Sequence, residues 1–139
     1  MLDADGIVAA LGALDLPRGD WAVHASAVLV LHGLVARAGD VDVVVRGPAW
    51  ERALGLGTPK RGKEDLCVSL PDLGVEVWSG WMGEDVDALI DAAETVRGVP
   101  CVTLEDVLRF KERAGRPKDA PHVTLLRRVL APHGGPRER

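Results

Sequence analysis

The sequence predicts an α/β (α+β) domain in which a small mixed β-sheet is covered by helices. Short apolar or β-branched runs alternate along the chain with longer amphipathic segments, and Pro, Gly, Ser, Thr or Asp marks most of the boundaries. A chain of 139 residues with 47% hydrophobic residues can also bury one core. We expect a single domain over residues 1–131, followed by a disordered tail over residues 132–139 that is rich in Pro, Gly and Arg.

The boundary signals define the expected elements. Asp3 or Asp5 caps the first helix, Pro48 starts a short helix, and Thr103 with Asp106 forms a capping box. The runs expected to be strands are 21–24, 41–45, 65–69, 74–78 and 99–102, with 65–69 and 74–78 able to pair as a hairpin. The segments expected to be helices end at or near Leu14, Gly33, Gly57, Thr95, Gly115 and Leu130, and the fourth of them is expected to run from Asp85 to Thr95.

Charge, cysteine content and the lack of long apolar runs narrow the class of protein. A formal net charge of −4 argues against nucleic-acid binding by general electrostatics, because phosphate neutralisation needs a basic surface. Cys67 and Cys101 lack metal-ligand spacing and are expected to be reduced, buried thiols. The start MLDADGIV has acids where a secretion signal carries basic residues. We therefore expect a cytoplasmic protein without membrane contact.

Two carboxylates stand at the head of the run GDVDVVV, which is otherwise expected to be buried. Side chains two residues apart on a strand point to the same face, so Asp40 and Asp42 share one face. A divalent cation relieves the repulsion between such acids, and Mg²⁺ prefers oxygen ligands. The alternative is that Asp40 caps the strand in solvent while Asp42 pairs with Arg37 or Arg46.

A third acid interrupts another apolar strand. Glu76 lies at the centre of GVEVW, and a buried strand that contains an acid usually provides it with a partner. If this strand adjoins GDVDVVV, Glu76 completes a three-carboxylate site suited to one or two Mg²⁺ ions. The alternative is an edge-strand residue that reaches water.

The segment HASAVLVLHGL places a hydroxyl where a helix follows a strand. Exposed N–H groups at such a point, with Ser26 beside them, suit a phosphate, although a plain N-cap has the same pattern. His24 and the tryptophans Trp50, Trp78 and Trp81 could contact a phosphate or a base, but packing roles are commoner for these residue types. The run TPKRGKED adds three cations that could steer a triphosphate, or could form a solvated loop.

The order of these features resembles the nucleotidyltransferase-fold superfamily, in particular its minimal bacterial and AbiEii-like members. Their pattern is a strand, a Gly-Ser pair that opens a helix, an Asp-x-Asp strand and a later strand with a third acid. The corresponding positions here are Ala25 and Ser26, GDVDVVV and Glu76. The segment LEDVLRFKERAGRPKDAPHVTLL is similar to the helix pair of these relatives, in which a Lys, an Arg and an Asp recur as Lys111, Arg116 and Asp119 do here.

The resemblance implies a Mg²⁺-dependent transferase that moves a nucleoside monophosphate from an NTP to a hydroxyl of a small molecule, a protein or an RNA end. Asp40 and Asp42 would hold Mg²⁺, and Glu76 would be the third metal ligand and help to deprotonate the attacking hydroxyl. Ser26 would contact the terminal phosphates. The chain is short for a large acceptor, so a cleft shared in a homodimer is a further expectation.

The other positions that the resemblance assigns to nucleotide binding either have an alternative role or depart from the family pattern. Lys111 and Arg116 fit phosphate or base contacts, or equally a helix end at which cations offset the negative dipole. Ala25 replaces the expected glycine, and its Cβ could narrow or disable the site. The alternative functions are therefore a catalytically weakened nucleotide- or metal-binding protein of a toxin–antitoxin or regulatory kind, and the same fold diverted to another reaction in secondary metabolism.

Overall fold

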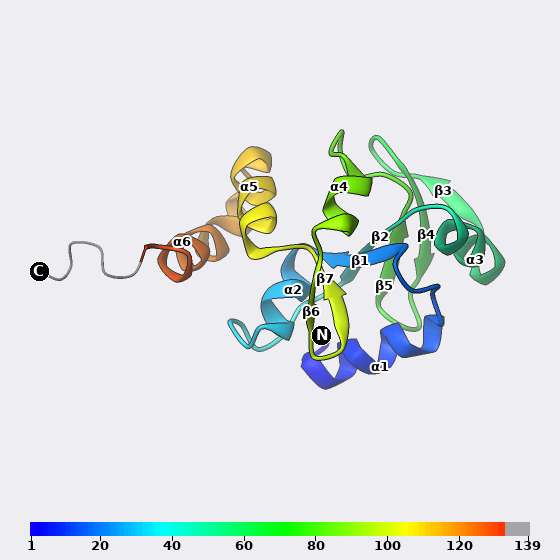
Figure 1. The fold of residues 1–139 in the computed structure, drawn as a ribbon, viewed down its shortest axis with the longest axis horizontal. Helices are drawn as coiled ribbons and strands as arrows, with labels where there is room; N and C mark the ends of the chain where they lie inside the picture. Colours follow the sequence, from blue (N-terminus) through cyan, green and yellow to red (C-terminus); the bar gives the residue numbers. More distant parts are fainter. Residues whose placement is uncertain (133–139) are drawn as a thin grey trace, which may run out of the picture.

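The computed structural model describes residues 1–132, so the expected tail lies outside the described residues from residue 133 on (Figure 1). The helices are α1 (Ala4–Leu14), α2 (Ser26–Leu31), α3 (Pro48–Leu56), α4 (Val86–Asp91), α5 (Leu104–Ala114), the short 3-10 turn η1 (Pro117–Asp119) and α6 (Ala120–Val129). The strands are β1 (Trp21–His24), β2 (Val41–Val45), β3 (Pro59–Arg61), β4 (Leu66–Leu70), β5 (Val75–Trp78), β6 (Glu94–Val96) and β7 (Val99–Cys101).

The strands form one mixed sheet in the order β3-β4-β5-β2-β1-β7-β6. β2 runs parallel to β5 and β1 runs parallel to β7, while the other neighbours are antiparallel. The expected mixed sheet with helices around it is therefore confirmed, although seven strands make it wider than the small sheet that was predicted. The predicted hairpin is also confirmed, because β4 and β5 pair antiparallel.

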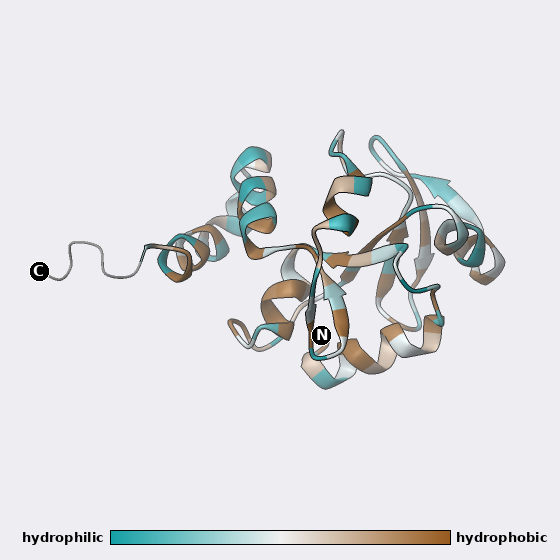
Figure 2. Cartoon of the chain, viewed as in Figure 1, coloured by the Kyte–Doolittle hydropathy of each residue, from teal (hydrophilic) through white to brown (hydrophobic). Residues whose placement is uncertain are grey.

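The central strands are buried because their sequences are apolar on both faces. In β2, all residues except Asp42 are buried, and Figure 2 shows apolar colouring concentrated in the central strands and α2. Strand β3 lies at the edge and is exposed and hydrophilic (Figure 2). Its Pro59, Lys60 and Arg61 are residue types that discourage a further strand from pairing at an edge.

The helix predicted to run from Asp85 to Thr95 is wrong in its second half. Asp85 caps α4 through its side chain, which accepts a hydrogen bond from the N–H of Ala88, but α4 ends at Asp91. The following residues form β6, which turns back into β7 through Arg97 and Gly98, at φ values of 54° and 79°. Two positive φ values in a two-residue turn match the twist of a hairpin, so pairing with β7 prevails over helix propensity here.

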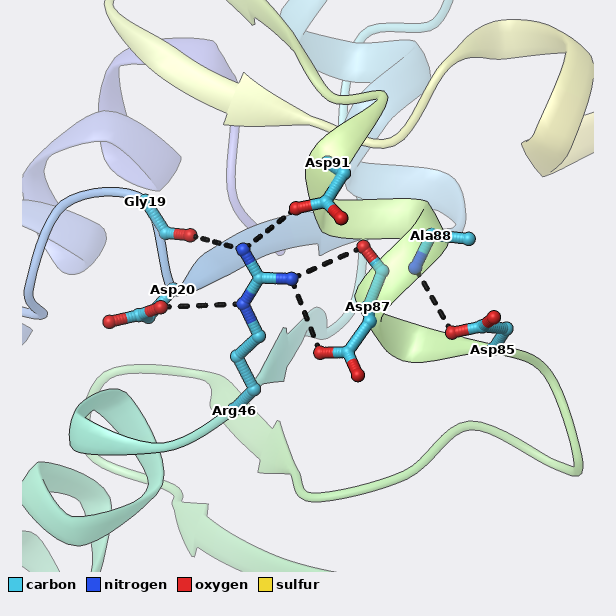
Figure 3. A network of polar contacts seen from close by, with 7 residues as sticks. All are labelled: Gly19, Asp20, Arg46, Asp85, Asp87, Ala88 and Asp91. Atoms are coloured by element: carbon cyan, nitrogen blue, oxygen red, sulfur yellow. Dashed lines mark hydrogen bonds and ion pairs between the residues drawn. The ribbon is translucent and has the colours of Figure 1, made fainter.

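Arg46 ties the far end of β2 to α4 and to the loop before β1 (Figure 3). Its guanidinium forms ion pairs with Asp20, Asp87 and Asp91 and donates to the backbone oxygen of Gly19 at 3.0 Å. These ion pairs and hydrogen bonds raise the pKa of Arg46 above its ordinary value. The guanidinium is thus fully engaged away from Asp42, and no ion pair between Asp42 and Arg37 or Arg46 occurs in residues 1–132.

None of the helices in residues 1–132 combines the length and apolar character needed to cross a membrane.

Candidate functional site

A row of polar side chains crosses four adjacent strands on one face of the sheet. His24 of β1 is the register partner of Asp42 of β2, Asp42 is the partner of Glu76 of β5, and Glu76 is the partner of Ser69 of β4. Register partners present their side chains on the same face, on strands about 4.8 Å apart. The two acids are therefore immediate neighbours at the centre of the sheet.

A cavity of about 280 Å³ opens beside this row, and Asp40, Asp42 and Glu76 all line it. Trp78 and Trp81 contribute apolar surface, and two further acids, Glu64 and Asp65, line the cavity from the turn between β3 and β4. Cations also line the cavity: Lys63, Arg116 and Lys118. The predicted carboxylates thus meet at one cavity, in which acids from the start of β2, from β5 and from the β3–β4 turn outnumber the cations of that turn and of the segment around η1.

The Asp42 carboxylate lies in an environment that disfavours its ionised form. Burial raises its pKa to about 6, and the nearby Glu76 and Asp40 add to this effect, while a hydrogen bond from Trp78 and the charge of Arg116 oppose it. Within residues 1–132, Asp40, Asp42 and Glu76 form no ion pair, although Arg116 and Lys118 line the same cavity. The negative charge of these three acids is therefore not neutralised by a bonded cation from the part of the chain that the structure describes.

The donor set suits Mg²⁺ only in part. In the described residues, no group of three or more His, Cys, Asp or Glu side chains is arranged to hold a metal ion by itself. Mg²⁺ in phosphate-transfer sites is commonly bound by one or two carboxylates, with substrate phosphates and water completing the shell. Asp42 and Glu76, with Asp40 beside them, provide carboxylate oxygens of that kind, so these residues fit a metal that arrives with a phosphorylated ligand.

Ala25 occupies a backbone conformation that favours glycine. Its φ of 62° and ψ of −142° lie close to a region that only glycine visits readily, and Gly47 has a similar conformation before α3. The N-cap position expected for Ser26 is wrong, because Ser26 is the first residue of α2 and Ala25 is the N-cap. No side chain caps this helix. The Gly-to-Ala difference noted in the sequence therefore coincides with real backbone strain.

Lys111 is buried and lies away from the cavity. Its Nζ donates to the Ser26 hydroxyl at 3.0 Å and to Asp119 Oδ1 at 2.9 Å, and only 1% of the residue is exposed. Burial lowers the pKa of Lys111, against the opposing effect of Asp119. Arg116 donates to the other oxygen of Asp119 at 2.7 Å and also lines the cavity. The structure thus brings Arg116 to the cavity and uses Lys111 to attach α5 to the start of α2.

His24 is fully buried at the end of the polar row. Its Nδ1 accepts a hydrogen bond from the N–H of Ala25 at 2.7 Å, which leaves the proton on Nε2. Nε2 has no hydrogen-bond partner and lies 3.6 Å from Glu84 Oε1, while the ring stacks on Trp81. Burial lowers the pKa of His24 despite the nearby Glu84. His24 is therefore a neutral, packed histidine in this structure.

Sequence reasoning missed the donor role of Trp78. Its indole N–H donates to Asp42 Oδ1 at 3.1 Å, and it follows Glu76 by two residues on the same strand. Strand alternation alone places Trp78 on the carboxylate face, so that signal was present in the sequence.

Comparisons of the chain with family models, curated proteins and solved structures find no match. The function must therefore be argued from the residues of the site.

Proposed function

We propose that this protein binds a nucleoside triphosphate together with Mg²⁺ at the Asp40–Asp42–Glu76 cavity and transfers the nucleoside monophosphate to a hydroxyl. The observation that carries this proposal is the pairing of Asp42 with Glu76 on adjacent central strands, in a cavity that is also lined by cations. Asp42 and Glu76 are half-buried neighbours without a bonded cation, an arrangement that is costly to a fold unless a ligand offsets their repulsion. A phosphate ligand that arrives with a divalent cation would satisfy both the carboxylates and the cations that line the cavity.

Each group of the cavity has a role in this reaction. Asp40 and Asp42 would supply ligand oxygens, and Arg116, Lys118 and Lys63 would bind phosphate oxygens by charge. When bound, Mg²⁺ neutralises charge on the phosphates and lowers the pKa of the attacking hydroxyl. Glu76 would accept the proton of that hydroxyl while the hydroxyl oxygen forms its bond to the α-phosphorus. The bond from the α-phosphorus to the bridging oxygen then breaks, and pyrophosphate leaves.

A second candidate, a nucleotide- or metal-binding protein with little or no turnover, is favoured by Ala25. A Cβ at this strained position prevents the close approach of backbone to phosphate that glycine permits. The α2 helix that follows has only six residues, and its Ser26 hydroxyl already accepts a hydrogen bond from Lys111. Phosphate binding would then depend on the cavity cations alone.

Transfer of an α-phosphate label separates these two candidates. Wild type, Glu76→Gln and Glu51→Gln are incubated with α-labelled NTPs, Mg²⁺ and a mixture of cellular small molecules, RNA and protein as acceptors. Glu51 is an exposed residue of α3 outside the cavity and serves as the matched control. The enzyme proposal predicts label transfer by wild type and Glu51→Gln and a loss of transfer rate of about 100-fold or more in Glu76→Gln. Binding of Mg²⁺ and NTP without transfer by any variant supports the second candidate.

A further inference from the structure

The side chain of Trp78 connects the carboxylate pair to the β3–β4 turn. Trp78 follows Glu76 on β5 and shares its face, and its indole N–H donates to Asp42 Oδ1 on the neighbouring strand β2 at 3.1 Å. The bond is part-buried and joins two cavity-lining residues. One carboxylate oxygen of Asp42 therefore has a fixed protein partner, while Oδ2 has no bonded donor among the described residues.

The chemistry of the donor distinguishes this contact from an ion pair. An indole N–H is neutral and can only donate, so it orients a carboxylate without cancelling its charge. A Lys or Arg in the same place would hold the carboxylate equally well but would compete with an incoming cation. The Trp78 contact thus restricts the rotation of Asp42 and leaves its negative charge available.

Packing holds the indole in place from the opposite side. Gly62, in the turn between β3 and β4, lies so close that a Cβ added there would be 2.7 Å from Cζ3 and 3.0 Å from Cη2 of Trp78. Trp81 packs edge-on against the same indole, with ring centroids 6.1 Å apart. The turn and Trp81 together confine the ring to the orientation in which its N–H meets Asp42.

We propose that Trp78 is a positioning residue of the carboxylate site, which fixes Asp42 for cation binding and is itself held by Gly62. This inference rests on the proposed function, because it assigns a partner to a proposed metal ligand. Partners that orient metal ligands typically contribute 10- to 100-fold to metal affinity. Loss of the indole N–H, or displacement of the ring by a Cβ at residue 62, should therefore weaken cation-dependent nucleotide binding by that factor.

Indole N–H signals in a ¹⁵N–¹H spectrum provide a direct test. The chain has four tryptophans, so four indole signals are expected, and the signal that is lost in Trp78→Phe belongs to Trp78. An equimolar mixture of the four NTPs is added to the protein, first with EDTA and then with excess Mg²⁺. We expect the Trp78 signal to shift only with Mg²⁺ and to give an apparent Kd for the wild type.

The variants then test the positioning role. The apparent Kd with Mg²⁺ is followed on the backbone amide signals of cavity residues, and it should rise 10- to 100-fold in Trp78→Phe and in Gly62→Ala. Gly62→Ala keeps every polar group of the site, and Gly62 has no positive φ, so this variant separates positioning from loss of the tryptophan. Trp50→Phe in α3 and Gly12→Ala in α1, where a Cβ meets nothing within 4 Å, are the matched controls and should bind as wild type does.

The outcomes distinguish the two proposals. If wild type binds the mixture with Mg²⁺ but Trp78→Phe and Gly62→Ala bind equally well, the positioning role is refuted and the proposed function stands. If wild type shows no Mg²⁺-dependent binding, the proposed function fails and the positioning role fails with it. A rise in apparent Kd in both variants, with both controls unchanged, supports the assignment.

Discussion

Lys111 and Asp119 form a buried ion pair between α5 and the turn before α6, with Nζ 2.9 Å from Oδ1. Lys111 also donates to Ser26, and Asp119 also accepts from Arg116. The two C-terminal helices are thereby attached to the start of α2 by one polar network. Both partners are almost fully shielded from solvent, so the pair fixes α5 relative to the turn before α6, from which Arg116 and Lys118 line the cavity.

Lys111→Met should destabilise the fold by about 1–3 kcal/mol, because it removes one of the two cations bonded to buried Asp119 and leaves Arg116 as the other. The double variant Lys111→Met/Asp119→Leu should recover part of that loss, since an apolar pair needs no charge partner. Lys60→Met, at an exposed position of β3, is the control and should lie within about 0.5 kcal/mol of wild type. Urea unfolding of the four proteins measures these differences, and equal stability of wild type and Lys111→Met would show that the pair is not structural.

Ala25→Gly should stabilise the protein by about 1 kcal/mol. Relief of an unfavourable positive φ is worth about 1–3 kcal/mol, and the greater freedom of glycine in the unfolded chain offsets part of it. Ala27→Gly in α2, where the backbone is helical, should instead destabilise by about 1 kcal/mol. Thermal unfolding compares the two variants. A fall in stability for both would mean that Ala25 is not strained.

Asp42→Asn should stabilise the ligand-free protein at pH 7 by about 1–2 kcal/mol. The pKa of Asp42 is raised to about 6, above its ordinary value near 4, so the folded state binds the proton more tightly than the unfolded state does. Wild-type stability therefore falls as pH rises from about 4 to 6, and the advantage of the variant grows over the same range. Urea unfolding at several pH values between 4 and 7 measures the difference. A constant difference across this range would contradict the environment described for Asp42.

His24 should make stability fall on acidification below about pH 6.5. Burial lowers its pKa in the folded state, so the unfolded state takes up the proton first as the pH falls. His24→Asn keeps an acceptor for the N–H of Ala25 but does not titrate. The difference in stability between wild type and His24→Asn should change by up to about 1.4 kcal/mol per pH unit below pH 6.5. If the stability of wild type and of His24→Asn changed with pH in the same way, His24 would not be a neutral buried histidine.

The central strands and the carboxylate positions could be predicted because the signals are local. Trp21–His24 and Val41–Val45 are short apolar runs with clear boundaries, and they form β1 and β2 with the predicted limits. Strand alternation then assigns Asp42 and Glu76 to defined faces. Their adjacency needed one further fact, the parallel register of β2 and β5, which has no local signal in the sequence.

Features that depend on long-range contacts could not be predicted. The local sequence of Glu94–Val96 indicates the end of a helix, and it is the pairing with β7 that makes this segment a strand. Arg46 gathers acids from two separate segments, one of them 45 residues further along the chain, and no spacing rule indicates this. The burial of Lys111 follows from contacts with Ser26 and Asp119, and the helical pattern of α5 alone does not identify it. In each case the packing of distant segments decides the outcome.

A calorimetric titration of the four NTPs into the protein with and without Mg²⁺, for wild type, Asp42→Asn and Glu51→Gln, tests the proposed carboxylate site directly. We expect wild type and Glu51→Gln to bind at least one NTP only with Mg²⁺, and Asp42→Asn, though folded and at least as stable, to bind none. Binding that is equally strong without Mg²⁺ or in Asp42→Asn would contradict a carboxylate-held metal. So would the absence of binding by wild type under every condition.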